Sequence, residues 1–589
     1  MKTIKNKIYV MFLLLFAAGM FSCDDLLKET VYDKLTEYQC PDCPVDGIYI
    51  ALRGQRAVPT TYPGSEFVWF LESISSDESC VPQRLSDWSD AGSHRDMQLH
   101  TWEPNYDSSR NRHIQSGWNY AYDIIGACNK ELRLPEEVAW GPVQQAQIRL
   151  VRAYAYMKLL DWFGNVPLVL EDNTTGVMPV SSKRIDVYNF IKSELEDPIM
   201  DNLPPRKTSE QWGEFVMRAL RIRLYLNSNV YMSNNLAVPL SDSDPAYVEN
   251  LNKVIEEADK IEASGKFRIV DYFASFYVDN DLPANNSDNI LTIRYDALQG
   301  TVGNFLTMLS HSSVVSFLFD IPVMSNCVNG PCLNPGRTGD ATTGVDTDPN
   351  SMYNILNENP NDIRRLSVIT GTQDATTGAY EALKDKKTGA DLFVVVTPIK
   401  YQPFFTGGFT GVSAGSATRS DGARMVKYEL IPTTAWEMDN DWVLIRYAEV
   451  IYSRAEAKIR LGQDATSDFQ MVLSHRGYNG KTLSYDGSGL SIDDYASKRN
   501  VATTALNIPV ENTLDFLEKE LRREFIFEGH RRTDMIRFGK FTGTWGLKTT
   551  PSAGYRTLYC IPDAVRNSQL NVKQNPGYAG YDNWTGQTY

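Results

Sequence analysis

The feature that most constrains the fold is a set of segments in which apolar residues recur with the period of an α-helix. The clearest example has apolar side chains at Leu150, Ala153, Tyr154, Met157 and Leu160. This spacing places one apolar stripe along one side of a helix, and such a stripe must be buried against another element. A chain built from several such segments is expected to fold as packed helices.

The same pattern returns later in the chain, in two stripes formed by Leu444, Tyr447, Ala448, Ile451 and Ala455, and by Leu514, Leu517, Leu521 and Phe525. Further helices are expected over 110–132, 184–197, 216–233 and 247–264.

Strand-like segments are few and short. One is Ile290–Ile293 and another is Leu392–Val396, which Pro398 follows closely. Long stretches between the helical segments are rich in Gly, Asn, Asp and Pro, which favour loops. The sequence therefore predicts a mainly α fold, a helical scaffold with large irregular loops and a few short strands.

The first 22 residues have the order of an export signal. Three lysines and no acidic residue precede an apolar run over 11–22, and Cys23 and Asp24-Asp25 follow it. The run is too short to span a bilayer comfortably. This order predicts a lipoprotein signal peptide over 1–22, cleavage before Cys23, and acylation of the Cys23 sulfur (palmitate). The alternative is a signal peptide cleaved elsewhere, with Cys23 incidental.

The remaining chain is acidic and large enough for a substantial core. Removing 1–22 takes away three lysines, so the net charge falls from −15 to −18. An acidic surface disfavours nucleic acid and anionic lipid as partners. Hydrophobic residues make up 42% of the sequence, and no Pro- or Ser-rich linker divides it. We therefore expect one domain over 23–589, held at the membrane by the lipid alone.

Seven cysteines follow Cys23. Cys40 and Cys43 form one close pair and Cys327 and Cys332 another, and both pairs are typical of short disulfides in an exported protein. The CxxC pair is also compatible with redox chemistry or zinc, although no second CxxC or nearby His pair supports a zinc site. Cys80, Cys128 and Cys560 have no assigned partner, and an odd number leaves at least one cysteine unpaired within the chain.

Five segments, in order, resemble the SusD/RagB family of outer-membrane nutrient-binding lipoproteins. One of them contains the run Asp161-Trp162-Phe163-Gly164-Asn165, and another contains Glu528-Gly529-His530-Arg531-Arg532. The five are Trp118–Asn129, Arg152–Leu168, Ile445–Gly462, Glu520–Gly539 and Ile561–Tyr578. They extend over almost the whole chain after Cys23, and the acidic pair behind Cys23 resembles the surface-export signal of these lipoproteins.

The resemblance implies a single SusD-like domain over 23–589, with a scaffold of tetratricopeptide-like helix pairs. It implies a lipid-anchored protein at the cell surface, on the outer membrane. There it captures an oligo- or polysaccharide as the lid of a SusC-like TonB-dependent transporter. Family members are usually not enzymes, and no cofactor is expected. Two alternatives stay open, a lid of the same type for peptides or proteins, and a surface glycosidase or esterase.

Two motifs bear on the enzyme alternative. Glu520, Glu524 and Glu528 recur at helical spacing, with Arg522, Arg523, Arg531 and Arg532 nearby. Paired carboxylates can hydrolyse glycosides, but this spacing favours salt bridges on a scaffold helix. The run Gly411–Gly415 matches G-x-S-x-G, with His475 and His530 downstream, but loop-forming residues flank it where a strand and a helix are required. No catalytic residue is predicted.

A third motif bears on calcium. Asp346, Asp348 and Asn350 resemble the start of a calcium loop. Ser351 stands where the turn glycine is needed and Asn357 where a bidentate Glu belongs, so an EF-hand is not expected. A looser structural calcium site in these Asp-rich loops remains open.

The predicted ligand site rests on aromatic residues in polar segments. Sugar rings stack their C–H faces on Trp or Tyr, and their hydroxyls need Asp, Asn or Arg. Arg84, Asp87 and Trp88 combine these groups in one polar stretch, whereas Trp118 and Trp162 have the apolar neighbours of core residues. Trp102 and Tyr428 complete the set of predicted ligand contacts.

Overall fold

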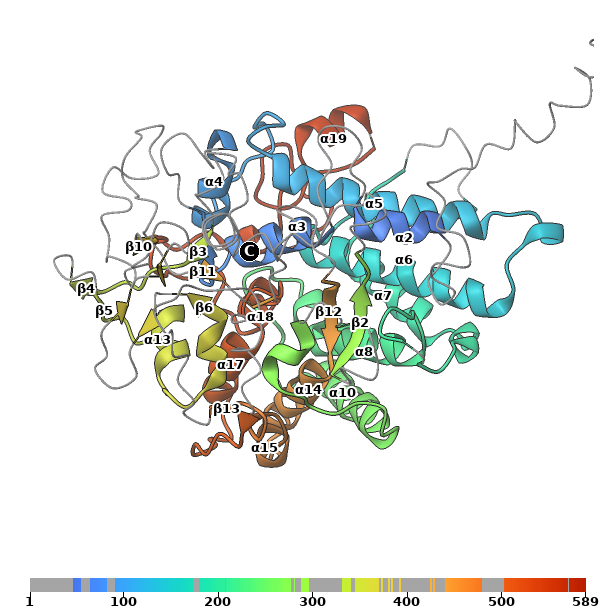
Figure 1. Ribbon diagram of the computed structural model, residues 1–589. Coiled ribbons are helices and arrows are strands. Elements are labelled where there is room, and N and C mark those ends of the chain that lie inside the picture. Colours follow the sequence, from blue (N-terminus) through green and yellow to red (C-terminus); the bar gives the residue numbers. More distant parts are fainter. Residues whose placement is uncertain are drawn as a thin grey trace, which may run out of the picture.

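The computed structural model describes residues 46–54, 64–81, 90–172, 179–206, 208–276, 280, 288–295, 331–340, 345–369, 372–373, 380–381, 383–384, 391–392, 424–425, 427–428, 440–478, 503–569 and 571–589. Helices dominate these residues, and short strands and irregular segments gather on one side (Figure 1). The mainly α architecture predicted from the periodic segments is confirmed.

Each predicted helical segment contains a helix. The principal helices are α5 (Arg112–Leu132), α6 (Pro142–Trp162), α7 (Arg184–Glu196), α8 (Glu214–Leu226), α9 (Ser228–Tyr231), α10 (Pro245–Ala263), α14 (Tyr447–Arg460), α15 (Thr466–Leu473), α17 (Leu514–Glu524) and α18 (Arg531–Arg537). Shorter ones are α2 (Asp46–Arg53), α3 (Gly64–Trp69), α4 (Ser93–Leu99), α13 (Met352–Asn357) and α19 (Asp563–Ser568), and a π-helical turn, η1 (Phe70–Ile74), follows α3.

The scaffold is built from helices that pack against one another, several of them neighbours in sequence. α5 and α6 lie side by side, joined by residues 133–141, and α7 packs on α6 (Figure 1). α8 packs on α10, α10 on α14, and α14 on α15. Each helix buries its apolar stripe against the helices that it packs on.

α6 is buried on more sides than its stripe predicts. From Leu150 to Trp162, Lys158 alone is more than 9% exposed. The polar residues on this helix are buried with partners, as Arg152 donates to Glu194 at 2.8 Å and Asp161 accepts from Arg532 at 2.8 Å. A helix that is buried all round marks the centre of a fold.

The one longer strand pair lies beside the helices. β2 (Asn289–Ile293) pairs antiparallel with β12 (Trp442–Arg446), and every residue of both strands is buried. The predicted strand at 290–293 is confirmed. Leu444, which we placed on a helical stripe, lies instead in β12, because this strand runs directly into α14. Of the predicted strand after Leu392, β10 (Asp391–Leu392) is described and the rest lies outside the described residues.

Each other described pair consists of two-residue strands. Two matter below, β1 (Ser79–Cys80) with β3 (Cys332–Leu333), and β13 (Gly477–Tyr478) with β14 (Thr503–Thr504). The rest are β4 (Gly339–Asp340) with β5 (Val345–Asp346), β6 (Val368–Ile369) with β11 (Arg424–Met425), β7 (Thr372–Gln373) with β8 (Tyr380–Glu381), and β9 (Leu383–Lys384) with β10.

Aromatic side chains fill the hydrophobic core. Trp69, Trp102, Trp162, Trp212 and Trp442 are each at most 1% exposed. Trp118 and Trp162 lie in this core as predicted. Within the part of the chain described above, no helix is both long and apolar enough to cross a bilayer.

Candidate functional site

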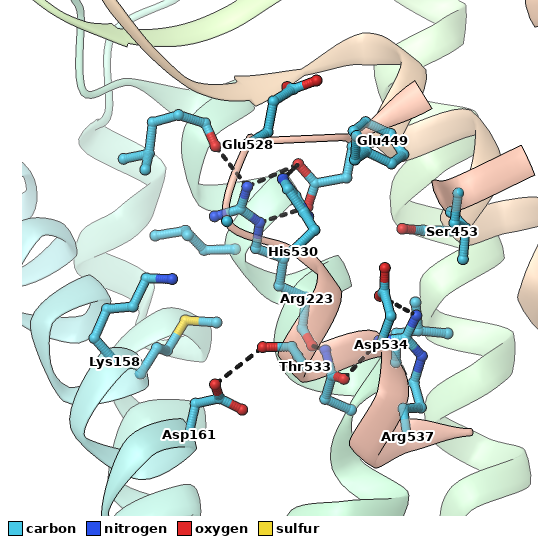
Figure 2. A pocket seen from close by; sticks show the side chains of 18 of the residues that line it. Lys158, Asp161, Arg223, Glu449, Ser453, Glu528, His530, Thr533, Asp534 and Arg537 are labelled. Carbon is cyan, nitrogen blue, oxygen red and sulfur yellow. Dashed lines mark hydrogen bonds and ion pairs between the residues drawn. The ribbon is translucent and has the colours of Figure 1, made fainter. Parts of the chain in front are cut away.

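The first hollow in the described chain lies inside the helical scaffold and is called the internal cavity (Figure 2). Its volume is about 80 Å³. Helices α6, α8, α14, α17 and α18 supply most of its wall, whose polar residues are Tyr154, Lys158, Asp161, Arg223, Asn227, Tyr231, Glu449, Ser453, Glu456, Glu528, His530, Thr533, Asp534 and Arg537.

Several of these polar groups bond to one another across the internal cavity. Arg223 donates through Nη2 to Glu449 Oε2 at 2.7 Å, and Thr533 Oγ1 donates to Asp161 Oδ2 at 3.0 Å. Burial lowers the pKa of His530 to about 4, so this ring is neutral near pH 7. Ligand pockets usually measure roughly 300–1,000 Å³, and the internal cavity has room for a few waters. It belongs to the scaffold and is too small for a sugar chain.

The charged residues of α17 form a buried ion network. Glu524 accepts from Arg476 Nη2 at 2.7 Å and from Arg446 Nη1 at 2.9 Å, and all three side chains are fully buried. Glu528 accepts from Arg446 Nη2 at 2.7 Å, and Glu520 pairs with Arg364 at 2.8 Å. The prediction of a salt-bridged scaffold helix is confirmed. Arg523 pairs with Glu520 at 2.6 Å within the helix, and the other partners come from distant segments.

The pKa values of this network do not fit acid–base catalysis. Burial by itself would raise the pKa of Glu520, Glu524 and Glu528, but the facing cations outweigh it and lower the pKa of all three. A glycosidase needs one carboxylic acid whose pKa is raised so that it can donate a proton. These carboxylates are charged near pH 7 and act as structural anions.

The second hollow lies on the side of the irregular segments and is called the loop-face cavity. Its volume is about 730 Å³, within the range of ligand pockets. Its wall comprises Asp77, Asn334, Pro335, Gly336, Arg337, Thr338, Asp348, Pro349, Asn350, Ser351, Glu518, Arg522, Arg531, Met535, Lys540, Gly543, Thr544, Trp545 and Gly546.

Two carboxylates and a guanidinium form the floor of this cavity. Arg531 donates through Nε and Nη2 to the two oxygens of Asp77, at 2.6 and 2.8 Å, and through Nη2 to Glu518 at 2.9 Å. Burial opposes charge on Asp77, but Arg522 and Arg531 hold its pKa well below its usual range. Charged pairs of this kind present fixed acceptors and donors to a polar ligand.

Two guanidinium nitrogens in the wall are left without a hydrogen-bond acceptor. Arg522 Nε and Arg531 Nη1 are buried and have no partner among the described residues. The side chain of Arg522 is 8% exposed and that of Arg531 4% exposed. Both side chains line the loop-face cavity, but these two nitrogens are themselves covered by neighbouring atoms.

The predicted ligand contacts are only partly located. Arg84, Asp87 and Trp88 lie outside the described residues, so they stay predictions. Trp102 is 1% exposed and donates through Nε1 to Tyr578 Oη at 2.5 Å. Tyr428 is also 1% exposed, and its Oη accepts from the Val443 amide at 3.1 Å. The assignment of these two rings as ligand contacts assumed exposed faces, and the structure corrects it by placing both in the core.

The Asp-rich loop is held by its own backbone. Asp346 accepts from the amides of Gly336 and Asp348, each at 2.9 Å, and Asp348 accepts from the amide of Arg337 at 2.7 Å. Among the described residues no three His, Cys, Asp or Glu side chains gather as a metal site would require. These carboxylates fix the shape of the loop that forms one wall of the loop-face cavity.

Other sequence candidates also lie outside the described residues. They are Cys23 with residues 1–22, the Cys40 and Cys43 pair, Cys327, and the Gly411–Gly415 motif. Sequence reasoning missed Asp77, Glu518 and Trp545 as residues of the loop-face cavity. Trp545 carried the one usable signal, an aromatic residue between Gly543-Thr544 and Gly546 in a polar loop.

Comparison with known proteins gives consistent matches. A profile of the SusD family matches residues 413–556, and a profile described as starch-binding associating with outer membrane matches 89–207. The starch-binding protein SusD of Bacteroides thetaiotaomicron is 27% identical over 473 residues, which cover 74% of this chain and 73% of that protein. A SusD-like protein of Formosa agariphila is 21% identical over 93% of this chain and 94% of its own length.

Solved structures agree in fold. Surface glycan-binding protein A from Bacteroides thetaiotaomicron, in complex with laminarihexaose, aligns with a TM-score of 0.55 at 17% identity, covering 90% of this chain and 97% of that one. Surface glycan-binding protein A from Bacteroides uniformis aligns with a TM-score of 0.58 at 18% identity and the same coverage. The five predicted segments, the helical fold and these matches agree, and the chain is similar to proteins of the SusD family.

Proposed function

We propose that this protein is a cell-surface lipoprotein that binds an oligo- or polysaccharide and delivers it to a SusC-like TonB-dependent transporter, over which it acts as a lid. SusD-family glycan-binding proteins are non-catalytic, so the role is capture without bond chemistry. The named relatives that bind starch and laminarihexaose support a glucan as the first ligand to test.

The loop-face cavity carries the proposal. Sugar hydroxyls donate and accept hydrogen bonds, and this cavity offers both kinds of partner. Asp77 and Glu518 supply carboxylate oxygens, and Arg522, Arg531 and Lys540 supply N–H groups, among the residues that line it.

Trp88 is the residue that we propose stacks on a sugar ring of the ligand. Residues 82–89 follow β1, and Asp77, two residues before β1, is part of the loop-face cavity. Arg84, Asp87 and Trp88 would add a stacking ring and further polar groups to the same ligand. Because a chain of sugars engages more such contacts than a single sugar, affinity is expected to rise with oligosaccharide length.

The anchor and the transporter follow from the export signal and the family. Cleavage before Cys23 and acylation of its sulfur would tether the domain to the outer membrane at the cell surface. A soluble ligand captured there stays close to the transporter, which raises its local concentration at the barrel.

Calorimetry of the chain from residue 24 onward tests the binding proposal, with starch, laminarin and a peptide panel as probes and reducing-sugar release followed in parallel. We expect one glucan to bind without product formation. Lys540→Ala should weaken binding severalfold, because the Lys540 ammonium lines the cavity and pairs with Glu518. Trp88→Ala should weaken it about tenfold, as expected for the loss of roughly 1.4 kcal/mol.

Lys260→Ala is the matched control. Lys260 is 42% exposed and pairs with Glu256, much as Lys540 is 46% exposed and pairs with Glu518, but it lies on α10. Binding to peptides alone would favour the peptide-carrying alternative. Product release that Ser413→Ala or Glu524→Gln abolishes would replace the binding proposal with the enzyme alternative.

A further inference from the structure

Two cysteines face each other across the short strand pair at the edge of the loop-face cavity. In the antiparallel pairing of β1 with β3, Cys80 lies directly opposite Cys332, and Ser79 lies opposite Leu333. Residues that are directly opposite in an antiparallel pair project to the same face of the sheet, with Cβ atoms about 4.5–5.5 Å apart. The two thiols are therefore neighbours although 252 positions separate them in sequence.

The distance between the two sulfurs is short enough for a bond to form with little movement. Sγ of Cys80 lies 3.5 Å from Sγ of Cys332. A disulfide requires about 2.05 Å, and the usual Cα separation of about 4.4–6.8 Å includes that of opposite residues in an antiparallel pair. Small side-chain rotations are enough to close the gap.

Hydrogen bonds from Asn334, directly after β3, hold the strands in this register. The amide of Asn334 donates to the carbonyl of Glu78 at 3.0 Å. The Asn334 side chain donates to the carbonyls of Ser76 and Ser79 at 3.0 and 2.9 Å. The approach of the two sulfurs is thus built into the strand pair and does not depend on a loose loop.

We propose that Cys80 and Cys332 form a disulfide in the exported protein. The inference rests on the proposed export, since disulfides form and persist in oxidising compartments. The oxidant is the disulfide of an exported thiol–disulfide oxidoreductase. One thiolate of this chain attacks that disulfide and releases one enzyme thiol, and the second thiolate then attacks the mixed disulfide and releases the other. Two thiols become one S–S bond, and the oxidoreductase takes up two electrons and both protons.

This pairing revises the pattern expected from sequence. Cys327 and Cys332 are close in sequence and favoured a short loop disulfide, whereas the structure brings Cys332 to Cys80. Cys128 lies in α5 and Cys560 lies shortly before α19, and both are fully buried. Among the described cysteines, the contact between two sulfurs occurs at Cys80 and Cys332 alone.

The bond would brace the loop-face cavity. Asp77 lies two residues before β1, and Asn334 follows β3 directly, and both are part of the cavity wall. A covalent link between the strands fixes the wall segment that carries Asp77 against the one that carries Asn334–Thr338. Pre-organised walls cost less conformational entropy when a ligand binds.

Peptide mapping by mass spectrometry tests the disulfide. The full chain, exported and purified without reductant, is treated with iodoacetamide under denaturing conditions and digested. We expect one cross-linked species that contains Cys80 and Cys332 and lacks two hydrogen atoms relative to the two free peptides. Alkylation of both cysteines, or a Cys327–Cys332 link instead, would overturn the proposal.

Variants separate the disulfide from general effects on folding. Cys332→Ser should abolish the cross-linked species and lower the melting temperature by a few degrees, since a closed loop restricts the unfolded chain. Cys128→Ser, at a buried cysteine in α5, should leave the species intact. If the species persists in Cys332→Ser, the linkage has been assigned wrongly.

Glucan binding and the Cys80–Cys332 disulfide are measured independently. A reducing agent should weaken glucan binding by the wild-type chain severalfold and leave the Cys332→Ser variant unaffected. A mapped disulfide in a protein that binds no glucan would leave the linkage standing and reject the proposed ligand. Free Cys80 and Cys332 thiols in a protein that binds glucan would reject the disulfide and leave the proposed ligand standing.

Discussion

Glu72 illustrates how one buried side chain can make stability depend on pH. It lies in the π-helical turn η1, is fully buried, and accepts from Trp162 Nε1 at 2.6 Å. Burial, with the nearby Asp161 carboxylate, raises the pKa of Glu72 to about 7. The Lys158 ammonium at 3.8 Å opposes this shift without cancelling it.

The Glu72→Gln variant should depend less on pH than the wild-type protein. An acid whose pKa is raised on folding stabilises the fold fully below its unfolded pKa, near 4.5, and that contribution is lost as the pH rises through about 7. Urea unfolding at pH 5 and pH 8 should therefore show a smaller difference in unfolding free energy for the variant, whose amide still accepts from Trp162.

Two other groups limit the expected effect. Burial raises the pKa of Glu78 to about 7 and that of Asp534 to about 6, so part of the dependence should remain in the variant. Glu256→Gln, at an exposed carboxylate of α10, serves as the control and should leave the wild-type difference between pH 5 and pH 8 in place. An undiminished difference in Glu72→Gln would show that Glu72 does not titrate in this interval.

At the scale of elements, α17 is held to several other segments by buried ion pairs. Its carboxylates pair with three arginines from other segments. Arg364 lies between α13 and α14, Arg446 lies at the N-terminus of α14, and Arg476 follows α15. Removing one member of a buried ion network leaves an uncompensated charge and usually costs about 3–5 kcal/mol.

Arg476→Met should therefore lower the free energy of unfolding by about 3–5 kcal/mol in a chemical denaturation experiment, because Glu524 loses two charge-assisted hydrogen bonds. Lys519→Met, on α17, is the control. Its ammonium pairs with Glu358 at the surface, so the expected change is within about 1 kcal/mol. Equal changes in the two variants would contradict a special role for the buried network.

The elements were predictable from sequence because helical periodicity is local. The stripe at 150–160 identifies α6, and the residues after 514 identify α17, without knowledge of their neighbours. The prediction for Leu444 was wrong because local periodicity does not report strand pairing. β12 is defined by its pairing with β2, more than a hundred residues away. The spacing on α17 also predicted salt bridges, while the partners depended on the fold.

The loop-face cavity was not predictable in this way. It joins Asp77, Asn334, Asp348, Arg522 and Trp545 from parts of the chain that are distant in sequence. Each residue has an ordinary surface or structural role when judged alone. Trp102 shows the opposite error, since a polar sequence context suggested exposure whereas packing against Tyr578 buries it.

At the scale of the whole molecule, anchoring and binding should be separable. Cys23→Ala should leave glucan affinity in solution unchanged, because no described residue of the loop-face cavity lies near the N-terminus. The variant should be lost from the cell surface, and uptake of the ligand should fall. Surface labelling, growth on the glucan and calorimetry measure the three properties.

Normal uptake by the Cys23→Ala variant would show that the tether is dispensable. A loss of affinity in solution would instead link the N-terminal segment to the ligand site. Asp24→Ala, next to Cys23, tests the acidic pair separately and should affect surface display without affecting acylation.

The pairing of β13 with β14 bears on how such a protein can diversify. Gly477 lies opposite Thr504 and Tyr478 opposite Thr503, so the chain positions on either side of residues 479–502 lie next to each other. The cost of closing a loop grows only with the logarithm of its length, about 0.6 kcal/mol for each doubling. Evolution, or a protein engineer, can therefore lengthen, shorten or replace the intervening sequence at this junction while the helices beneath keep their places.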